Sequence, residues 1–152
     1  MKLEGIAEFP YDPAAVWRAL HDVDILAKTI PGCKSVVTTG ENEYDVAVAL
    51  GVAAIKGEYE GRVQVDDVEF PSYYVINGEG SGKPGYVKVR VDCHLDATEL
   101  GTSMRWSSDA EVGGLIAGIG GRVLTGISKH MAKQFFKALN EEMKSVQDAT
   151  QS

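Results

Sequence analysis

The sequence predicts an α+β fold, in which a curved antiparallel sheet of about seven strands wraps round one long C-terminal helix. Three observations favour this class. Segments between residues 33 and 112 alternate apolar and polar side chains, which is typical of half-buried antiparallel strands. The segment from 112 to 144 instead repeats its apolar residues every three to four positions, which indicates a helix. A sheet with one apolar face must cover that face, and this helix is the candidate cover.

The first part of the chain predicts one strand followed by two short helices. Asp12 precedes Pro13, and this pair is typical of an N-cap followed by the first helical residue. Asp22 is placed to cap a second helix in the same way. We therefore expect a strand at 3–9 and helices at about 13–20 and 23–29.

The strands of the central segment are separated by short turns. Within residues 53–65, Tyr59 and Val63 fall on one face of the predicted strand. Their neighbours Glu58 and Arg62 fall on the other face, which should point toward water. We expect turns at Gly40-Glu41-Asn42, Phe70-Pro71, 81–85 and Leu100-Gly101.

The predicted closing helix combines an apolar stripe with many glycines. The stripe consists of Leu115, Ile119, Val123, Ile127, Met131, Phe135 and Leu139. Each interior glycine costs a helix about 1 kcal/mol relative to alanine, so the half of the helix up to Gly126 should gain something else. We expect it to be loosely packed, to line the mouth of a pocket and to move during ligand uptake. The expected gate residues are Gly113, Gly114, Gly118 and Gly121.

Composition limits the class of protein. The 152 residues predict a single domain over 1–145, followed by a polar tail at 146–152. A net charge of −7 excludes nucleic acid as a partner, because phosphate binding needs a concentrated positive surface. The two cysteines lie far apart, which favours a reduced, intracellular protein over a disulfide scaffold. Because no secretory signal and no membrane-spanning apolar run are present, we expect a cytoplasmic protein.

No arrangement of residues predicts a catalytic centre, a metal site or a cofactor. Cys93 and His94 are adjacent, but neighbours on a strand point to opposite faces and cannot both bind one ion. Cys33 follows a Pro-Gly turn, where it is either a reactive thiol or, as we favour, a small buried residue. No pair of carboxylates is placed to act as general acid and base, so we expect no enzyme activity.

The predicted concave face favours a cavity. Gly57 and Gly61 would leave room opposite the glycine-rich part of the helix, and tyrosine hydroxyls would supply polar anchors. The alternative is that the aromatic side chains fill a solid core. On the cavity interpretation, the ligand-binding residues are Tyr44, Val46, Val48, Ile55, Tyr59, Val63, Tyr74, Tyr86, Val89, Met104, Trp106, Leu115, Ile119, Val123 and Ile127.

A row of positive charges follows the predicted helix. We call Arg122, Lys129, Lys133 and Lys137 the basic ridge. The ridge is either a solvated helix face, with lysines suited to the C-terminal part of the helix dipole, or a contact for anionic lipid or an acidic partner. An exposed strand edge would in addition allow a homodimer.

Short motifs recur in a fixed order along the chain. They are Val16-Trp17, Pro31-Gly32-Cys33, Gly57-Glu58-Tyr59-Glu60-Gly61, Gly78-Glu79-Gly80 with Gly82, Gly101-Thr102, the glycine-rich segment ending in Gly120-Gly121-Arg122-Val123-Leu124, and Gln134-Phe135-Phe136. In this order they resemble the family of the carbon monoxide dehydrogenase G subunit, from about Lys2 to Leu139. The resemblance implies a helix-grip fold of the START-like, polyketide-cyclase-like (SRPBCC) superfamily.

The resemblance also implies a function. Members of that family are generally non-catalytic accessory proteins of molybdenum-containing carbon monoxide dehydrogenases, and related proteins occur beside other molybdenum hydroxylases. With the predicted cavity, this implies a protein that binds a lipid or quinone and helps couple the enzyme to the membrane, with peripheral contact at the inner face of the cytoplasmic membrane. Two alternatives stay open, namely a docking module with a solid core and a cyclase-type enzyme that uses a cavity tyrosine or histidine.

Overall fold

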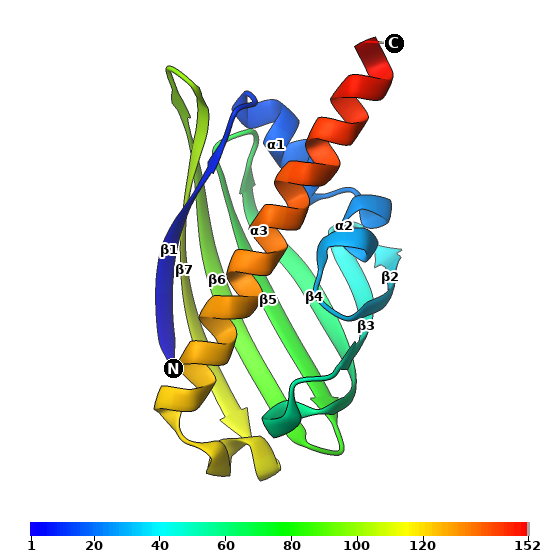
Figure 1. Ribbon diagram of the computed structural model, residues 1–152, viewed down its shortest axis with the longest axis vertical. Helices are drawn as coiled ribbons and strands as arrows, with labels where there is room; N and C mark the ends of the chain where they lie inside the picture. Colours follow the sequence, from blue (N-terminus) through cyan, green and yellow to red (C-terminus); the bar gives the residue numbers. More distant parts are fainter. Residues whose placement is uncertain (152) are drawn as a thin grey trace.

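A single antiparallel sheet curls round one long helix, which crosses the concave face of the sheet (Figure 1). This computed structural model describes residues 1–151, apart from the side chains of residue 53 and residues 148–151. The strands are β1 Lys2–Phe9, β2 Cys33–Gly40, β3 Glu43–Leu50, β4 Gly57–Glu69, β5 Tyr73–Gly82, β6 Gly85–Thr98 and β7 Gly101–Gly113. The helices are α1 Pro13–Leu20, α2 Val23–Thr29 and α3 Gly121–Gln151, with short 3-10 turns η1 Ala53–Ile55 and η2 Gly114–Ile119.

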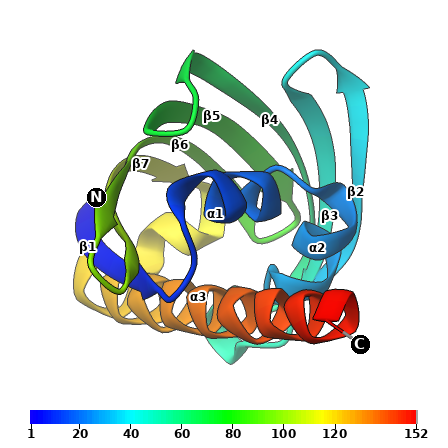
Figure 2. The ribbon, with the colours of Figure 1, turned by 90° about the horizontal axis from the view of Figure 1, so that it is seen from above.

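The strand order β1-β7-β6-β5-β4-β3-β2 places the first two strands at opposite edges of the sheet. Strands β2 to β7 follow one another as hairpins, whereas α1 and α2 carry the chain from one edge to the other. Figure 2 shows the sheet as an open trough, with α3 along its opening and α1 and α2 inside one end. The predicted fold class is therefore confirmed.

Both short helices begin where their capping residues predict. The Asp12 carboxylate accepts a hydrogen bond from the Ala15 N–H at 2.8 Å. The Asp22 carboxylate accepts one from the Asp24 N–H at 2.9 Å and a second from the Ile25 N–H. Each carboxylate satisfies helix-end donors that have no partner within the helix. As a result, α1 and α2 occupy the ranges that the sequence predicts.

The closing helix starts later than its sequence pattern indicates. The prediction placed the helix from 112 onward, but α3 begins at Gly121. Strand β7 instead runs to Gly113 in register with β6, and η2 follows. Gly114 and Gly120 have positive φ angles of 74° and 99°, which glycine adopts readily and which a right-handed helix excludes. The glycines therefore end a strand and form a turn instead of loosening a helix.

A second 3-10 turn replaces the start of a predicted strand. The alternation from residue 53 predicted a strand, but β4 begins at Gly57. The Ile55 N–H donates to the Val52 carbonyl at 2.9 Å, which closes η1. Ile55 is nevertheless buried, so the pattern predicts its burial correctly while misjudging its backbone conformation.

The C-terminal end is helical beyond the predicted domain boundary. The polar tail was expected from 146, but α3 continues to Gln151. No glycine or proline follows Lys144, so the sequence contains none of the usual signals that end a helix. Residue 152 of the expected tail lies outside the described residues. Among the helices that the structure describes, none is both long and apolar enough to cross a membrane.

Two clusters of buried side chains hold α3 on the sheet. The larger cluster lies at the α1 end and includes Val16, Leu95 and Leu139, the last of which has no exposed surface. The smaller cluster joins Ile55, Ile116 and Leu124, where η1, η2 and the start of α3 meet. Figure 1 shows these two regions at opposite ends of the trough, so α3 is anchored at both ends.

Candidate functional site

A cavity of about 390 Å³ lies between α3 and the concave face of the sheet, next to the larger cluster. Most of its lining is aliphatic or aromatic. The lining side chains are Leu20, His21, Leu26, Ile30, Pro31, Val36, Tyr44, Val46, Val63, Val65, Tyr74, Ile76, Val91, Cys93, Met104, Trp106, Met131, Ala132, Phe135 and Phe136. They come from both short helices, from six strands and from α3, so the cavity is a product of the whole fold.

A second cavity of about 260 Å³ lies beside the smaller cluster. Its apolar lining includes Val48, Leu50, Ile55, Tyr59, Val87, Val112, Ile116, Leu124 and Ile127. Val46 and Met131 line both cavities, so the two spaces are neighbours with these side chains between them. Both volumes are of the order of known small-molecule pockets, which span about 300–1,000 Å³.

Few polar atoms reach the larger cavity. The Nδ1–H of His21 donates to the Trp17 carbonyl, with 2.7 Å between the nitrogen and the oxygen. The His21 ring stacks on Trp17 at 4.6 Å between centroids and meets the edge of Tyr74 at 4.8 Å. Its other nitrogen, Nε2, is buried and has no hydrogen-bond partner in the part of the chain that the structure describes. An unpaired buried acceptor costs about 1–3 kcal/mol, so this nitrogen needs an explanation.

The buried titratable groups of the larger cavity are neutral near pH 7. Burial lowers the pKa of His21 below its ordinary 6.5 and outweighs the hydrogen bond to Trp17, which acts in the opposite direction. Burial, with smaller contributions from the neighbouring Cys93, raises the pKa of Tyr74 well above 10. Burial also raises the pKa of Cys93 to about 12. Such a cavity suits an uncharged apolar ligand better than acid-base chemistry.

The smaller cavity has a satisfied tyrosine in its wall. The Tyr59 hydroxyl donates to the Ile55 carbonyl at 2.6 Å, which ties β4 to the turn η1. Burial raises the pKa of this hydroxyl, so it stays protonated at neutral pH. Within the described part of the chain, no three His, Cys, Asp or Glu side chains come close enough to hold a metal ion.

The structure brings most of the sequence-predicted pocket residues together. Six of them line the larger cavity: Tyr44, Val46, Val63, Tyr74, Met104 and Trp106. Val46 also lines the smaller cavity, together with Val48, Ile55, Tyr59 and Ile127. Because strand alternation predicts faces reliably, the residues on β3, β4 and β7 lie where expected. Their role in binding a ligand stays a prediction.

Three predicted pocket residues lie elsewhere. Tyr86 is 47% exposed on the outer face, because the next residue along the strand, Val87, occupies the concave face. Leu115 is 79% exposed and Val123 is 49% exposed. Leu115 lies in η2, outside α3, and Val123 lies in the first turn of α3, where its neighbour Leu124 takes the buried position. The buried face of α3 accordingly begins at Leu124.

Val89 and Ile119 lie near the cavities without lining either of them. Val89 shares the concave face with Val87 and packs beside Gly78, where its Cγ1 lies 3.5 Å from the position that a Cβ would occupy. Ile119 packs partly buried against the smaller cluster. Their role in binding a ligand stays a prediction.

The four expected gate glycines lie at the end of β7, in η2 and at the first residue of α3, and none lines a cavity. The Tyr86 ring occupies the space that a side chain at Gly113 would need, and Gly114 faces the Gly85 backbone. Gly118 and Gly121 face open space. Close packing explains the glycines at 113 and 114. A gating role for Gly118 and Gly121 stays a prediction.

All four residues of the basic ridge are exposed. The ion pairs found among the described residues join Lys28 to Glu142, Lys34 to Glu58, Arg62 to Asp45, Arg90 to Asp92 and Arg105 to Asp96. The ridge takes part in none of these pairs. Its charges are therefore available to an external partner.

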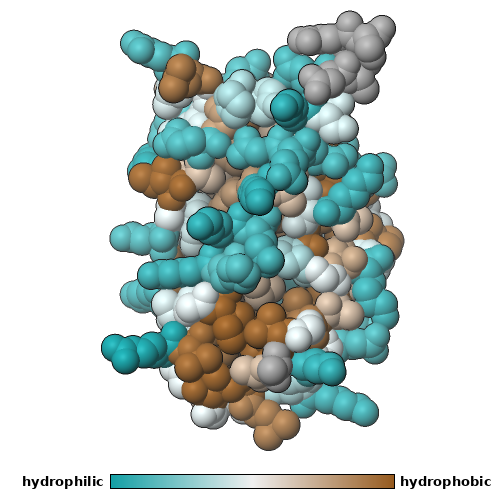
Figure 3. Space-filling model, viewed as in Figure 1, coloured by the Kyte–Doolittle hydropathy of each residue, from teal (hydrophilic) through white to brown (hydrophobic). Residues whose placement is uncertain are grey.

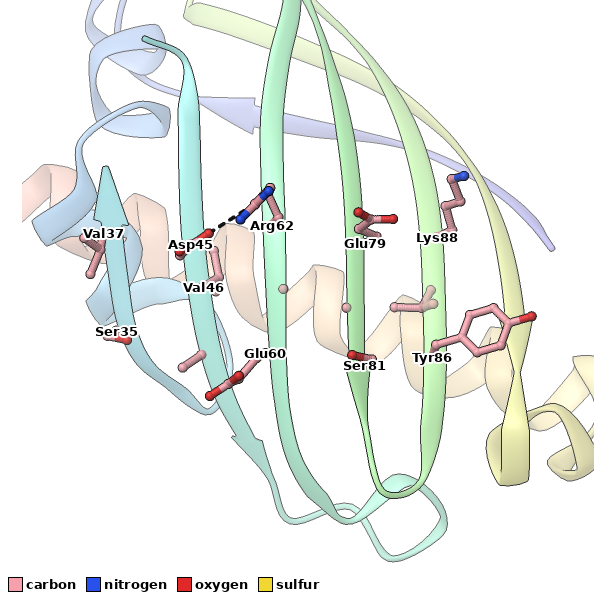
Figure 4. Close-up of a pocket in the computed structure, with 14 residues that line it drawn as sticks. Ser35, Val37, Asp45, Val46, Glu60, Arg62, Glu79, Ser81, Tyr86 and Lys88 are labelled. Carbon is pink, nitrogen blue, oxygen red and sulfur yellow. Dashed lines mark ion pairs between the residues drawn. The ribbon is translucent and has the colours of Figure 1, made fainter. Parts of the chain in front are cut away.

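A hollow of about 750 Å³ lies on the outer face of the sheet and is lined by charged, polar and apolar side chains (Figure 4). Its charged side chains come from neighbouring strands and are Asp45, Glu60, Arg62, Glu79 and Lys88. Arg62 forms an ion pair with Asp45 at 3.5 Å. These groups are solvated, and burying them against a small ligand would cost free energy. We therefore take the smaller apolar cavities as the candidate site.

Sequence reasoning missed the part of the larger cavity that α1, α2 and the C-terminal half of α3 supply. His21, Leu26 and Ile30 lie close to the predicted caps, and their apolar surroundings could have indicated an inward face. Phe135 and Phe136 form adjacent walls, with ring centroids 5.2 Å apart. Phe135 belongs to the predicted stripe, so the sequence contained a signal for this wall.

The whole-chain comparison decides the family. The family described as the carbon monoxide dehydrogenase G subunit (CoxG) matches residues 5–144. The chain belongs to this family. Membership in the CoxG family suggests an accessory role for carbon monoxide dehydrogenase. No significant match was found among curated proteins.

Solved structures of similar chains support the CoxG assignment at the level of the fold. A conserved protein from Geobacillus kaustophilus is 34% identical, with a TM-score of 0.92 and coverage of 95% of this chain and 96% of the other. Ara h 8.0201 is 17% identical, with a TM-score of 0.74 and coverage of 95% and 98%. A protein from Thermus thermophilus is 11% identical, with a TM-score of 0.72 and coverage of 96% and 99%. The START-like helix-grip fold is thus shown.

Proposed function

We propose that the protein binds an uncharged apolar molecule, a lipid or a quinone, between the sheet and α3, and that it serves a molybdenum-containing carbon monoxide dehydrogenase or related hydroxylase as a non-catalytic accessory protein. The observation that carries the proposal is the pair of adjoining apolar cavities on the concave face. The buried titratable groups of the larger cavity are neutral, so an apolar ligand in this cavity does not lie beside a buried charge.

The energetics favour exchange with a membrane. Burying a hydrocarbon tail gains about 0.8 kcal/mol per CH₂ relative to water. Relative to a bilayer the gain is near zero, since the tail already lies in an apolar medium. A protein with such a cavity can therefore take up and release its ligand at a membrane, and polar contacts to the head of the ligand set its selectivity.

An exposed apolar surface lies at the end of the molecule where the smaller cavity is found. We call Val52, Leu115 and Val123 the apolar tip; they are 41%, 79% and 49% exposed. Figure 3 shows apolar side chains gathered at the lower end of the molecule, near the start of α3. Ile116 and Leu124 follow Leu115 and Val123 in the chain and line the smaller cavity.

The apolar tip is flanked by positive charge. Lys56 follows η1, and Arg122 precedes Val123. The turn that contains Lys83 is held against η2, because the Ile116 N–H donates to the Pro84 carbonyl at 2.8 Å. Apolar side chains with a basic surround suit a bilayer with anionic lipids. We assign peripheral membrane contact to this tip together with Arg122, and leave Lys129, Lys133 and Lys137 of the basic ridge for an acidic surface of the partner enzyme.

Transfer from vesicles tests this proposal. The protein is mixed with phosphatidylcholine vesicles that contain phylloquinone, the vesicles are removed by flotation, and quinone in the protein fraction is measured after organic extraction. We expect stoichiometric uptake. We also expect Leu115→Asp with Val123→Asp to slow uptake at least tenfold, because charged side chains resist entering the bilayer surface.

The matched control reverses charge on the same helix but away from the tip. Lys129→Glu with Lys133→Glu should leave the uptake rate from these uncharged vesicles within twofold of the parent rate. If the parent protein extracts no quinone and no phospholipid, the binding proposal is wrong. If Lys129→Glu with Lys133→Glu slows uptake while Leu115→Asp with Val123→Asp does not, the basic ridge and not the apolar tip contacts the membrane.

A further inference from the structure

The hydrogen bonding of His21 defines which of its nitrogens is protonated. Nδ1 lies 2.7 Å from the Trp17 carbonyl oxygen, which can only accept a hydrogen bond. Nδ1 therefore carries the proton, and in the neutral ring Nε2 is a bare acceptor. The lone pair of Nε2 diverges from the Nδ1–H bond, so it points away from the backbone of α1.

This acceptor has no partner among the described residues. Nε2 is buried and makes no hydrogen bond, while the ring is fixed between Trp17 and Tyr74. The same side chain lines the larger cavity. Burial lowers the pKa of His21, so at neutral pH the ring does not gain a second proton. A ligand hydroxyl that reaches Nε2 would supply the missing donor.

The other polar side chains of the larger cavity differ from His21, because each of them can also donate a hydrogen bond. Tyr44, Tyr74 and Trp106 each carry a hydrogen-bond donor, and the Cys93 thiol interacts with the Tyr74 hydroxyl. Nε2 of His21 can accept but cannot donate. The cavity thus combines an apolar lining with one fixed ring nitrogen that can only accept.

We propose that His21 Nε2 accepts a hydrogen bond from a hydroxyl group of the bound apolar ligand, so the cavity selects an alcohol, a phenol or a hydroquinone. The inference rests on the proposed function, because it names the head-group chemistry of the ligand in the same cavity. A quinone carbonyl can only accept, so the oxidised form of such a ligand makes no hydrogen bond to His21 Nε2. The reduced form gains the additional bond and binds more tightly.

A pair of probes of nearly equal shape tests the assignment. 1-Naphthol and 1-methylnaphthalene differ by a hydroxyl in place of a methyl group, and binding to each is measured by tryptophan fluorescence at pH 7.5. A purely apolar cavity prefers the methyl compound, because water solvates the hydroxyl. We expect the parent protein to bind 1-naphthol about tenfold more tightly, which one hydrogen bond in a dry site can supply.

Substitution of His21 then separates the outcomes. In His21→Phe, which keeps an aromatic ring beside Trp17, the preference should be lost while 1-methylnaphthalene binds as before. In His21→Gln, whose amide supplies both a donor and an acceptor, part of the preference should return. Binding of 1-methylnaphthalene shows in each variant that the cavity is intact.

Each remaining outcome contradicts one defined part of the account. If both probes bind the parent protein but 1-naphthol has no advantage, the histidine assignment fails and the cavity proposal stands. The assignment also fails if the advantage survives in His21→Phe. If neither probe binds, the proposed function fails, and the assignment fails with it.

Discussion

Replacing Val46 with tryptophan is expected to reduce binding of a long-chain ligand at least tenfold. Val46 lines both cavities, so a large ring at this position separates them and removes the space that an extended ligand needs. Overpacking a filled core costs about 1–3 kcal/mol, but here the added ring enters existing space. The measurement is uptake of phylloquinone from vesicles, with circular dichroism as a check on folding.

The control for this substitution adds the same ring outside the cavity. Val37 lies on the neighbouring strand β2 and is 54% exposed, so Val37→Trp should leave uptake unchanged. The small probe 1-methylnaphthalene should still bind to Val46→Trp, because it needs only part of the space that the two cavities offer together. Unchanged uptake of the long-chain ligand by Val46→Trp would show that the ligand does not span the two cavities.

Replacing Leu139 with alanine is expected to lower the free energy of unfolding by about 3–4 kcal/mol. Leu139 has no exposed surface and packs in the larger cluster, where it fastens the C-terminal half of α3 to the rest of the core. Urea unfolding measures the change through the shift of the midpoint at constant slope. The loss should appear as a single cooperative transition, because one cluster connects α1, α3 and the sheet.

Leu115 offers the same substitution in the opposite environment. It is 79% exposed, so Leu115→Ala should change the free energy of unfolding by no more than about 0.5 kcal/mol. A loss below about 1 kcal/mol for Leu139→Ala would mean that α3 is not held by this core. The helix would then be free to leave the sheet, and the cavity would lack a fixed wall.

Local chemistry made much of the fold predictable. Asp12 and Asp22 cap α1 and α2, and both helices occupy their expected ranges. Strand alternation placed Tyr44, Val63 and Met104 on the concave face, because its period of two depends on local backbone geometry alone. These features need no knowledge of distant contacts, which explains why the sequence indicates them.

The errors arose where distant contacts decide the outcome. The segment before Gly121 has a helical spacing of apolar residues, but pairing between β6 and β7 extends the strand to Gly113. Tyr86 was assigned to the pocket because it is aromatic, although the alternation of inward and outward side chains along β6 puts it on the outer face. His21 enters the cavity wall through the packing of α1 on the sheet, which the sequence pattern of an isolated helix does not show.

The central claim is that an apolar ligand occupies the space between the sheet and α3. The most direct measurement is a crystal structure of the protein after it has been loaded with phylloquinone from vesicles. The account predicts continuous ligand density that passes Val46 and Met131 and extends along both cavities. Side chains that close this space, or ligand density only on the outer face beside Arg62 and Lys88, would contradict it.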